Sequence, residues 1–269
     1  MSFQLNPALK SSIQRITFIG QLLFQKGWAE KNAGNLSWDV TDDILEPLLS
    51  LTEFNVHPYA DYPAELQNRW LFVTGTNTRF RDIEKKPDQC LGLLHFLENQ
   101  NGYACVWGGQ NNFKPTSELH SHLRLHHFLL KQKKIFKVVL HTHPDELIAL
   151  THLPETNNPE TLNWALWGML PEVKLFAPQG IGLVPYHLTG TDILAQATVE
   201  VLTHGHQVIL WEKHGVLALG TDPEDAFDQI DVLNKAAKIY LLCKQTGQNP
   251  QRLTQSQIEE ISRTYQKKI

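Results

Sequence analysis

The stretch of sequence that decides the fold is Lys137-Val138-Val139-Leu140-His141-Thr142-His143-Pro144. Its β-branched and apolar residues predict a buried strand, and Pro144 closes that strand because proline cannot donate to a β-ladder. Proline is also favoured in the first turn of a helix, so a helix is expected over Asp145 to Thr151. Two histidines therefore stand at the end of a buried strand.

The segments on either side of this stretch alternate between helical and strand patterns. Helices are expected over 7–26, from Thr116 or Ser117 onward, from Thr189 or Thr191 to Leu202, and over 223–243. Strands are expected over 36–40, 70–73, 102–106, 173–177, 207–211 and 215–219. Because the alternation lacks a strict βαβ rhythm, it predicts a layered α/β domain with a mixed, largely antiparallel sheet.

The chain of 269 residues reads as a single domain over 1–269, because neither a linker nor a shift in composition divides it. Residues 42–69 lose the regular periodicity and are rich in proline and polar residues. This pattern is typical of an excursion inserted on the surface of a domain.

Composition excludes several kinds of partner. The chain has 24 Lys and Arg against 28 Asp and Glu, a formal net charge of −4, so nucleic acid is not expected to bind. No apolar run approaches the ~20 residues that cross a bilayer, so a membrane is not expected as a partner. The first residues lack a basic segment followed by an apolar one, so we expect a cytoplasmic protein.

Histidine is a more suitable metal ligand here than cysteine. Three cysteines, an odd count without a CxxC motif, argue against a disulfide framework and a thiolate site. Thirteen histidines are available instead. Imidazole and carboxylate ligands favour zinc or a neighbouring first-row ion.

His141 and His143 are the first candidates, because side chains at alternate positions of a strand leave from the same face and can converge on one ion. His214 is the leading candidate for a third ligand, since it lies in a short junction between two apolar strands. The alternative for each histidine alone is a strand cap or a hydrogen bond to a backbone carbonyl. The pair together with His214 favours a metal site.

Two carboxylates accompany these histidines. Glu118, near the start of a predicted helix, is a candidate metal ligand or general base, although a glutamate in a capping region is common. Glu172, between Pro171 and the predicted strand 173–177, is the second candidate, and its alternative is a solvated residue at a strand end.

Three turns combine small or hydroxyl side chains with backbone amides, a composition that suits phosphate. They are Asn32-Ala33-Gly34-Asn35, Thr74-Gly75-Thr76-Asn77 and Pro115-Thr116-Ser117. Each taken alone is also an ordinary turn. His122 and His126, spaced by one helical turn, are interpreted as part of a polar helix face because the HExxH arrangement is absent.

These motifs, in this order and spacing, resemble the class II (zinc-dependent) sugar-phosphate aldolase family. The resemblance is carried by Gly34-Asn35-Leu36-Ser37, Phe72-Val73-Thr74-Gly75, Thr116-Ser117-Glu118-Leu119, Val139-Leu140-His141-Thr142-His143 and Lys213-His214-Gly215-Val216. Within the family, the chain is most similar to the bacterial rhamnulose-1-phosphate aldolases, through the segment 26–32, the 42–69 excursion and the overall length.

The resemblance implies a three-layer α/β/α domain that assembles as a homotetramer. It implies one Zn²⁺ per subunit on His141, His143 and His214, with Glu118 as the catalytic carboxylate and Glu172 as a second one. The phosphate pocket of the family corresponds to Asn32, Gly34, Asn35, Thr74, Gly75, Thr116 and Ser117. The implied reaction is reversible cleavage of a small sugar phosphate, L-rhamnulose 1-phosphate, to dihydroxyacetone phosphate and L-lactaldehyde.

Alternatives on the same scaffold stay open. They are fuculose-phosphate aldolase, ribulose-phosphate 4-epimerase and methylthioribulose-phosphate dehydratase activities, and a non-catalytic interaction domain like that of adducin. The presence of all three histidines and Glu118 argues against the interaction domain, which has no need of the full set.

Overall fold

The fold is described from a computed structural model, which covers residues 3–45, 54, 56–59, 62–98, 102–110 and 113–265. The strands are β1 (Asn35–Asp39), β2 (Val56–Pro58), β3 (Trp70–Thr74), β4 (Leu91–Phe96), β5 (Gly102–Gly108), β6 (Val138–Thr142), β7 (Ile181–Val184), β8 (Val208–Trp211) and β9 (Gly215–Gly220). The helices are α1 (Pro7–Gln25), α2 (Pro87–Cys90), α3 (Leu119–Lys131), α4 (Asp145–Leu150), α5 (Pro159–Trp167), α6 (Pro171–Phe176), α7 (Asp192–Thr203), α8 (Pro223–Gln245) and α9 (Gln255–Tyr265). Short 3₁₀ turns lie at η1 (Thr41–Asp43), η3 (Ala64–Leu66) and η4 (Phe80–Asp82).

In the described part of the chain, the strands form one sheet in the order β2-β5-β4-β3-β1-β6-β9-β8-β7. Neighbouring strands are antiparallel except for β7 and β8, which run parallel. The predicted mixed, largely antiparallel sheet is confirmed. The strand that carries His141, β6, lies in the middle of it, and His143 follows directly after this strand.

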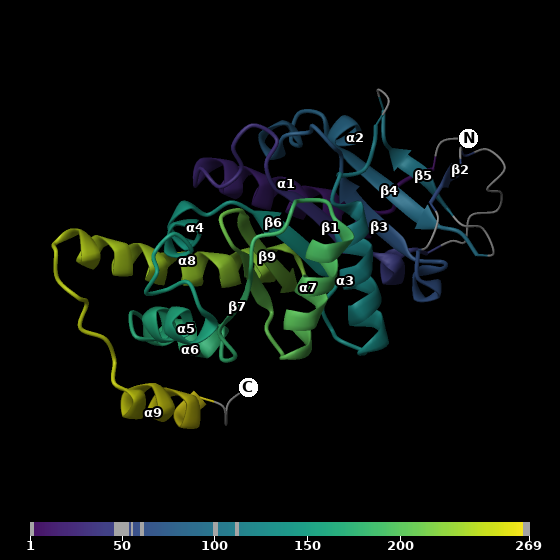
Figure 1. Cartoon of the computed structure of the whole chain (residues 1–269). Helices are drawn as coiled ribbons and strands as arrows, with labels where there is room; N and C mark the ends of the chain where they lie inside the picture. The colour runs from purple at the N-terminus through teal and green to yellow at the C-terminus, as the bar shows by residue number, and fades with distance from the viewer. Residues whose placement is uncertain are drawn as a thin grey trace.

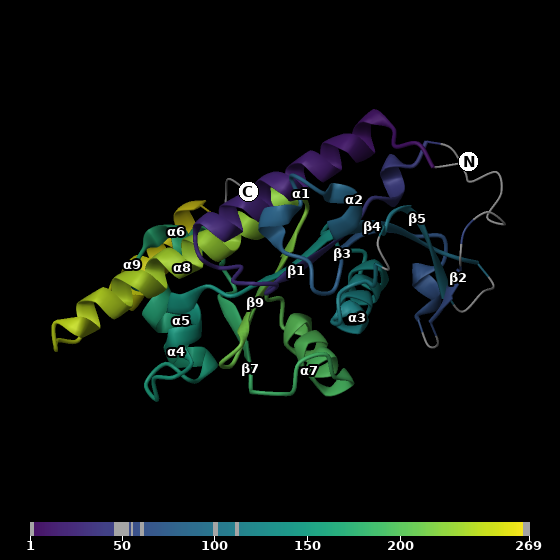
Figure 2. The same cartoon turned by 90° about the horizontal axis from the view of Figure 1, so that it is seen from above.

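Helices cover both faces of the sheet (Figure 1), and the view from above separates the layers (Figure 2). The long helices α1 and α8 lie side by side on one face, and α3 and α7 lie on the other. The predicted α/β/α layering is therefore confirmed. None of the described helices is long and apolar enough to span a membrane.

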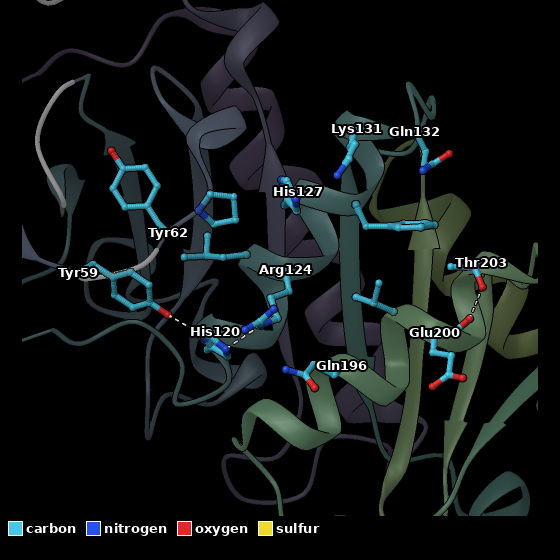
Figure 3. A pocket seen from close by; sticks show the side chains of 14 residues that line it. Tyr59, Tyr62, His120, Arg124, His127, Lys131, Gln132, Gln196, Glu200 and Thr203 are labelled. Carbon is cyan, nitrogen blue, oxygen red and sulfur yellow. Dashed lines mark hydrogen bonds between the residues drawn. The ribbon is translucent and has the colours of Figure 1, made fainter.

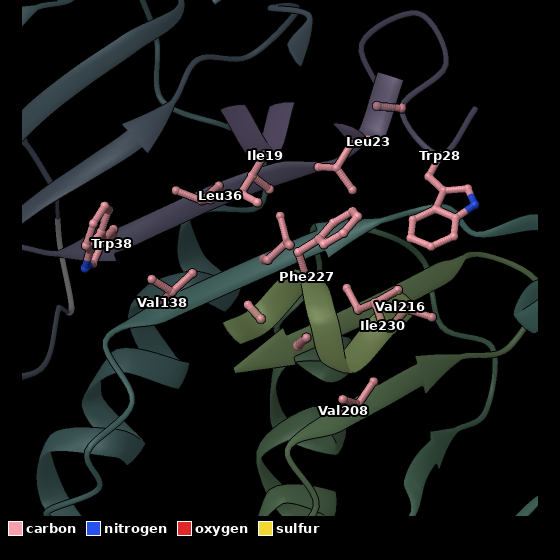
Figure 4. Close-up of a cluster of buried hydrophobic side chains, with 14 of the residues drawn as sticks. Ile19, Leu23, Trp28, Leu36, Trp38, Val138, Val208, Val216, Phe227 and Ile230 are labelled. Carbon is pink, nitrogen blue, oxygen red and sulfur yellow. The ribbon is translucent and has the colours of Figure 1, made fainter. Parts of the chain in front are cut away.

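The main core lies between the sheet and the α1–α8 layer (Figure 4). There Leu23 of α1 and Phe227 and Ile230 of α8 pack toward the sheet residues Leu36 and Val216. All five side chains are at most 4% exposed. Full burial of one such side chain stabilises the fold by roughly 1.5–3 kcal/mol, so this face holds the helices in place.

Two of the predicted site residues, Asn35 and His141, lie on the opposite face of the sheet, and the alternation of side chains along β1 and β6 explains why. Leu36 and Leu140 point into the α1–α8 layer, whereas Val139 packs in the cluster below α3 and α7. Because strand side chains alternate, Asn35 and His141 point to the α3 side, like Val139. Asn35 is also paired with His141 in the register of β1 and β6.

The prediction of a strand over 173–177 is wrong, because Pro171–Phe176 forms helix α6. Pro171 occupies the first turn of this helix, the position in which proline is favoured, and only Val173 of the helix is buried. Phe176 is 57% exposed, so the apolar residues of the segment do not form a strand face. The strand on this side of the sheet is β7, which the sequence did not predict.

Two further differences concern boundaries. α3 begins at Leu119 with Glu118 as its N-cap, later than the expected Thr116 or Ser117, because the Thr116 amide instead donates to the Thr74 carbonyl at 2.9 Å. Within the 42–69 excursion, residues 56–58 pair with β5 as an edge strand. The excursion's residues 46–53, 55, 60 and 61 lie outside the described residues.

Candidate metal and catalytic site

The three histidines predicted as ligands meet at one point of the structure. His141 is the residue before the last one of β6, His143 follows the strand, and His214 lies in the turn between β8 and β9. One ring nitrogen of each lies within 4.8 Å of the others, and their ring centroids are 4.8–5.3 Å apart. His141 is 1% exposed, and the other two are half-buried.

Two glycines permit this convergence. A Cβ at residue 215 would lie 2.7 Å from His143 Cδ2 and 2.8 Å from His141 Cε1, so only glycine leaves room for both rings. Gly34 has a φ of +77° in the turn before β1, and a Cβ there would lie 2.8 Å from the His141 carbonyl oxygen. Lys213 adopts a φ of 57°, which turns the hairpin and presents His214 to the site.

Hydrogen bonds fix the protonation of two of the rings. His141 Nδ1 lies 2.9 Å from the Val216 carbonyl oxygen, and His143 Nδ1 lies 2.8 Å from Glu30 Oε1. Both partners are acceptors, so each Nδ1 carries the proton and donates. In the neutral rings, the Nε2 atoms then hold lone pairs, and these two atoms are 3.2 Å apart.

Two facing lone pairs at this distance repel each other unless a cation lies between them. Two imidazole nitrogens, each ~2.05 Å from a tetrahedral ion, are about 3.3 Å apart, which matches the observed separation. Nδ1 of His214 is buried and has no hydrogen-bond partner among the described residues. The donor set therefore fits a divalent metal ion held by three imidazoles.

Electrostatics also favours a metal over protons at this point. Burial and the neighbouring His143 lower the pKa of His141 well below its ordinary value. Burial and the neighbouring His141 lower the pKa of His214 to about 3. Because only the neutral ring binds metal, the depressed pKa values keep these two rings available to a metal in mildly acidic solution.

Glu118 lies beside the three histidines. Its Oε2 is 3.9 Å from His141 Nε2, and its side chain is 8% exposed. The Asn35 amide nitrogen donates to the same Oε2 at 2.7 Å. Although Glu118 is the N-cap of α3, its side chain makes no capping bond, so the carboxylate is directed into the site.

The three segments predicted to bind phosphate are neighbours in the structure. The Leu36 amide donates to Thr74 Oγ1 at 3.0 Å, the Thr116 amide donates to the Thr74 carbonyl, and Gly75 forms a β-bridge with Pro115. Thr74 is buried and its hydroxyl is occupied by the Leu36 backbone. Thr74 therefore joins the segments and has little freedom to bind a ligand.

The remaining members of that set differ in access. Ser117 is exposed and Asn32 is half-buried, so both can reach a ligand. Asn35 is 7% exposed, and its amide group is engaged by Glu118 and His122. Thr116 is buried, and its hydroxyl accepts from the Glu118 amide at 3.3 Å.

Glu172, the second predicted carboxylate, is exposed in the first turn of α6. That helix packs against α8 and α9, and no described hydrogen bond or ion pair joins Glu172 to the three histidines. Within this chain the structure does not bring Glu172 together with Glu118. Its catalytic role stays a prediction.

The interpretation of His122 and His126 as a polar helix face is wrong. They are 1% and 2% exposed, and both bond to Ser37 of β1 across the interface between α3 and the sheet. The sequence contained a signal for this pairing, because polar Asn35 and Ser37 alternate with apolar residues in a strand. Glu30, whose carboxylate accepts from His143 Nδ1 and fixes its tautomer, was not predicted from the sequence.

A cavity of about 520 Å³ lies between α3, α7 and the residues Tyr59, Tyr62 and Pro63 (Figure 3). Its lining includes Tyr59, His120, Arg124, Lys131 and Glu200. Asp192 Oδ1 lies 2.6 Å from His120 Nε2 and 2.5 Å from Arg124 Nη2. None of the three converging histidines lines this cavity, so it is separate from the candidate metal site.

Comparison with known proteins is consistent with this geometry. The model of the "Class II Aldolase and Adducin N-terminal domain" family matches residues 14–241. A rhamnulose-1-phosphate aldolase from Bacteroides thetaiotaomicron is 37% identical over 263 residues, which cover 95% of this chain and 94% of that protein.

Solved structures show the same similarity. The crystal structure of a sugar-phosphate aldolase from Thermotoga maritima is 33% identical, with a TM-score of 0.78 over 91% of this chain and 99% of that chain. An L-fuculose 1-phosphate aldolase is 19% identical, with a TM-score of 0.63 over 95% of this chain and 96% of that chain, which shows the shared fold.

Proposed function

Because the chain belongs to the Class II Aldolase and Adducin N-terminal domain family, we propose that it is a zinc-dependent aldolase that reversibly cleaves L-rhamnulose 1-phosphate to dihydroxyacetone phosphate and L-lactaldehyde. The observation that carries the proposal is the convergence of His141, His143 and His214 beside Glu118. The name of the 37% identical relative supports this choice of substrate.

His141, His143 and His214 would hold the metal, one ion per subunit. Three nitrogen ligands without a thiolate favour zinc among the common biological ions. When bound, the ion supplies a Lewis acid that polarises the carbonyl of the ketose phosphate. Trp211 stacks on His214 with ring centroids 5.2 Å apart and closes this side of the site.

Glu118 would transfer the proton at C3 of the substrate. In condensation, a base removes a C3 proton from dihydroxyacetone phosphate, and the electron pair left on C3 attacks the aldehyde carbon to form the C3–C4 bond. The aldehyde oxygen takes up a proton from a second acid–base group and becomes the C4 hydroxyl. In cleavage, that second group removes the C4 hydroxyl proton, the C3–C4 bond breaks, and the first group returns the proton to C3. The burial of this carboxylate and its position next to His141 support this role, and Glu172 is proposed as a second acid–base group.

The phosphate of the substrate would be held by the adjoining segments Asn32 to Asn35, Thr74 to Gly75 and Thr116 to Ser117. Ser117 offers an exposed hydroxyl and Asn32 an accessible amide, while Thr74 keeps the segments together. Binding the phosphate fixes the reacting carbon relative to Glu118, so part of the binding energy serves orientation.

We also propose that residues 1–269 form one domain, which the continuous sheet supports, and that the enzyme is a cytoplasmic homotetramer. Light scattering tests the assembly, with four times 30.7 kDa as the expected mass. A monomeric mass at assay concentrations contradicts the tetramer.

The function is tested by following dihydroxyacetone phosphate release from L-rhamnulose 1-phosphate. We expect cleavage that disappears after treatment with a chelator and returns when zinc is added. L-Fuculose 1-phosphate and ribulose 5-phosphate are assayed in parallel. Faster turnover of either would assign the site to that sugar, and a folded, zinc-loaded protein without turnover would favour an adducin-like interaction domain.

Replacing Glu118 by glutamine separates metal binding from proton transfer. The amide has nearly the shape of the carboxylate but cannot accept the C3 proton, so we expect a loss of at least ~100-fold in kcat. Zinc content should stay at one ion per chain. Near-normal turnover of Glu118→Gln contradicts the proposed role.

A further inference from the structure

A continuous chain of hydrogen bonds runs from Glu118 into the protein interior. Asn35 Nδ2 lies 2.7 Å from Glu118 Oε2, and Asn35 Oδ1 lies 2.5 Å from His122 Nε2. Ser37 Oγ then lies 2.6 Å from His122 Nδ1 and 2.7 Å from His126 Nε2. The chain thus joins β1 and α3 through five side chains.

The chemistry of the groups gives this chain a single direction when Glu118 is ionised. A carboxylate oxygen only accepts, so the amide nitrogen of Asn35 faces it and the amide oxygen faces His122. His122 Nε2 must then donate, and in the neutral ring its Nδ1 accepts from the Ser37 hydroxyl. Ser37 Oγ in turn accepts from His126 Nε2. Every donor in the chain therefore points toward Glu118.

The opposite direction is possible only with a proton on Glu118 Oε2. Reversal would turn the Asn35 amide so that its oxygen faces Oε2 at 2.7 Å, a contact that requires Oε2 to donate. It would also require both histidines to move their proton to the other ring nitrogen. The forward chain therefore disfavours protonation of Oε2 and leaves Oε1 as the oxygen that can accept a proton.

The inner members of the chain have no access to a substrate. Ser37, His122 and His126 are 1%, 1% and 2% exposed. Burial lowers the pKa of both histidines to about 3, so both rings are neutral near pH 7, as the chain requires. These three residues can influence the site only through Asn35 and Glu118.

We propose that Ser37, His122 and His126 are positioning residues that hold Asn35 and Glu118 in one orientation, so that Oε2 is a fixed acceptor and Oε1 receives the C3 proton. The proposal rests on the proposed role of Glu118 as the proton-transfer group. Cooperative hydrogen bonds in a buried, fully satisfied chain restrict each member to one arrangement.

The first test measures the tautomers directly and does not depend on turnover. The ¹⁵N spectrum of the histidine-labelled, zinc-loaded protein at pH 7.5 reports which ring nitrogen carries the proton, and His122→Gln and His126→Gln assign the two signals. We expect both rings to be neutral with the proton on Nε2. A charged ring, or a proton on Nδ1 of His122, overturns the proposal.

The second test compares Ser37→Ala with Ser121→Ala. Ser121 is also buried, at 2% exposure, but its hydroxyl has no hydrogen-bond partner among the described residues, so it is a matched control in α3. Loss of one neutral hydrogen bond that orients Glu118 should lower kcat about tenfold in Ser37→Ala, with KM within twofold and full zinc content. Ser37→Thr, which keeps the hydroxyl, should restore most of the loss.

The outcomes separate this proposal from the proposed function. Equal kcat values for Ser37→Ala and Ser121→Ala, or a change in KM alone, overturn the positioning role. If Ser37→Ala does not fold, the tautomer measurement on the wild-type protein still decides. A wild-type protein without aldolase activity refutes the function, whereas the tautomers still test the direction of the chain.

Discussion

Replacing His95 by phenylalanine is expected to make the protein less sensitive to acid. His95 of β4 is 8% exposed and stacks on Trp70 of β3, with ring centroids 4.1 Å apart. Its Nδ1 has no hydrogen-bond partner among the described residues, and burial lowers its pKa from 6.5 to about 4. Phenylalanine keeps the stacked ring and removes the titrating group.

The magnitude follows from the difference between the folded and unfolded states. Below pH 6.5 His95 is protonated in the unfolded chain but stays neutral in the folded protein until the pH approaches about 4. The free energy of unfolding therefore falls as the pH decreases over this range. At pH 7.5 the neutral His95 lowers the free energy of unfolding by less than about 0.1 kcal/mol. At pH 5.0, which is about 1.5 units below 6.5, it lowers this free energy by about 2 kcal/mol, since one pH unit corresponds to about 1.36 kcal/mol.

Urea unfolding at pH 7.5 and 5.0 measures this difference. Any change in packing caused by phenylalanine shifts both free energies equally and cancels in the comparison. We expect the stability loss on acidification to be about 2 kcal/mol smaller in His95→Phe than in the wild type. The exposed His152 gives the control His152→Gln, which should lose as much stability as the wild type. Equal losses for His95→Phe and the wild type refute the reasoning.

Three further predictions concern the candidate metal site and Trp211, which stacks on His214. Glu30→Gln weakens the acceptor that orients His143, so the metal affinity measured by chelator competition should fall by about 10–100-fold. An unchanged affinity would mean that Glu30 is not required. His214→Ala should lose zinc during dialysis, and in the wild type zinc addition should change the fluorescence of Trp211, which stacks on His214. Thr198→Val removes the acceptor 3.0 Å from Trp211 Nε1 and should cost about 1–3 kcal/mol in urea unfolding, with recovery in Thr198→Ser.

The central part of the fold and the placement of His141 and His143 could be predicted from the sequence because their patterns are local. The run that ends in His141 and His143 is a strand by composition, and the alternation of side chains explains why His141 faces α3. Segment 173–177 could not be assigned by the same means, because five residues fit both a strand and a helix period. There the position of Pro171 and the packing of Val173 decide.

The buried roles of His122 and His126 could not be predicted from the helix alone. A polar residue on a helix is normally solvated, and only the pairing of α3 with β1 supplies the partner Ser37. Glu30 was missed for a similar reason, since its partner His143 is 113 residues away in the chain. Contacts at such separations depend on the complete sheet.

Because these contacts join residues far apart in the chain, the candidate site forms only when most of the fold is in place. The bonds that orient the site join residues 83 apart for Glu118 and Asn35, 75 apart for His141 and Val216, and 113 apart for His143 and Glu30. Contacts between distant residues form slowly and late, because a long loop must close before they stabilise anything. A ribosome-bound chain that has not yet released Val216 therefore cannot complete the candidate metal site, and the convergence of the three histidines is expected among the last events of folding.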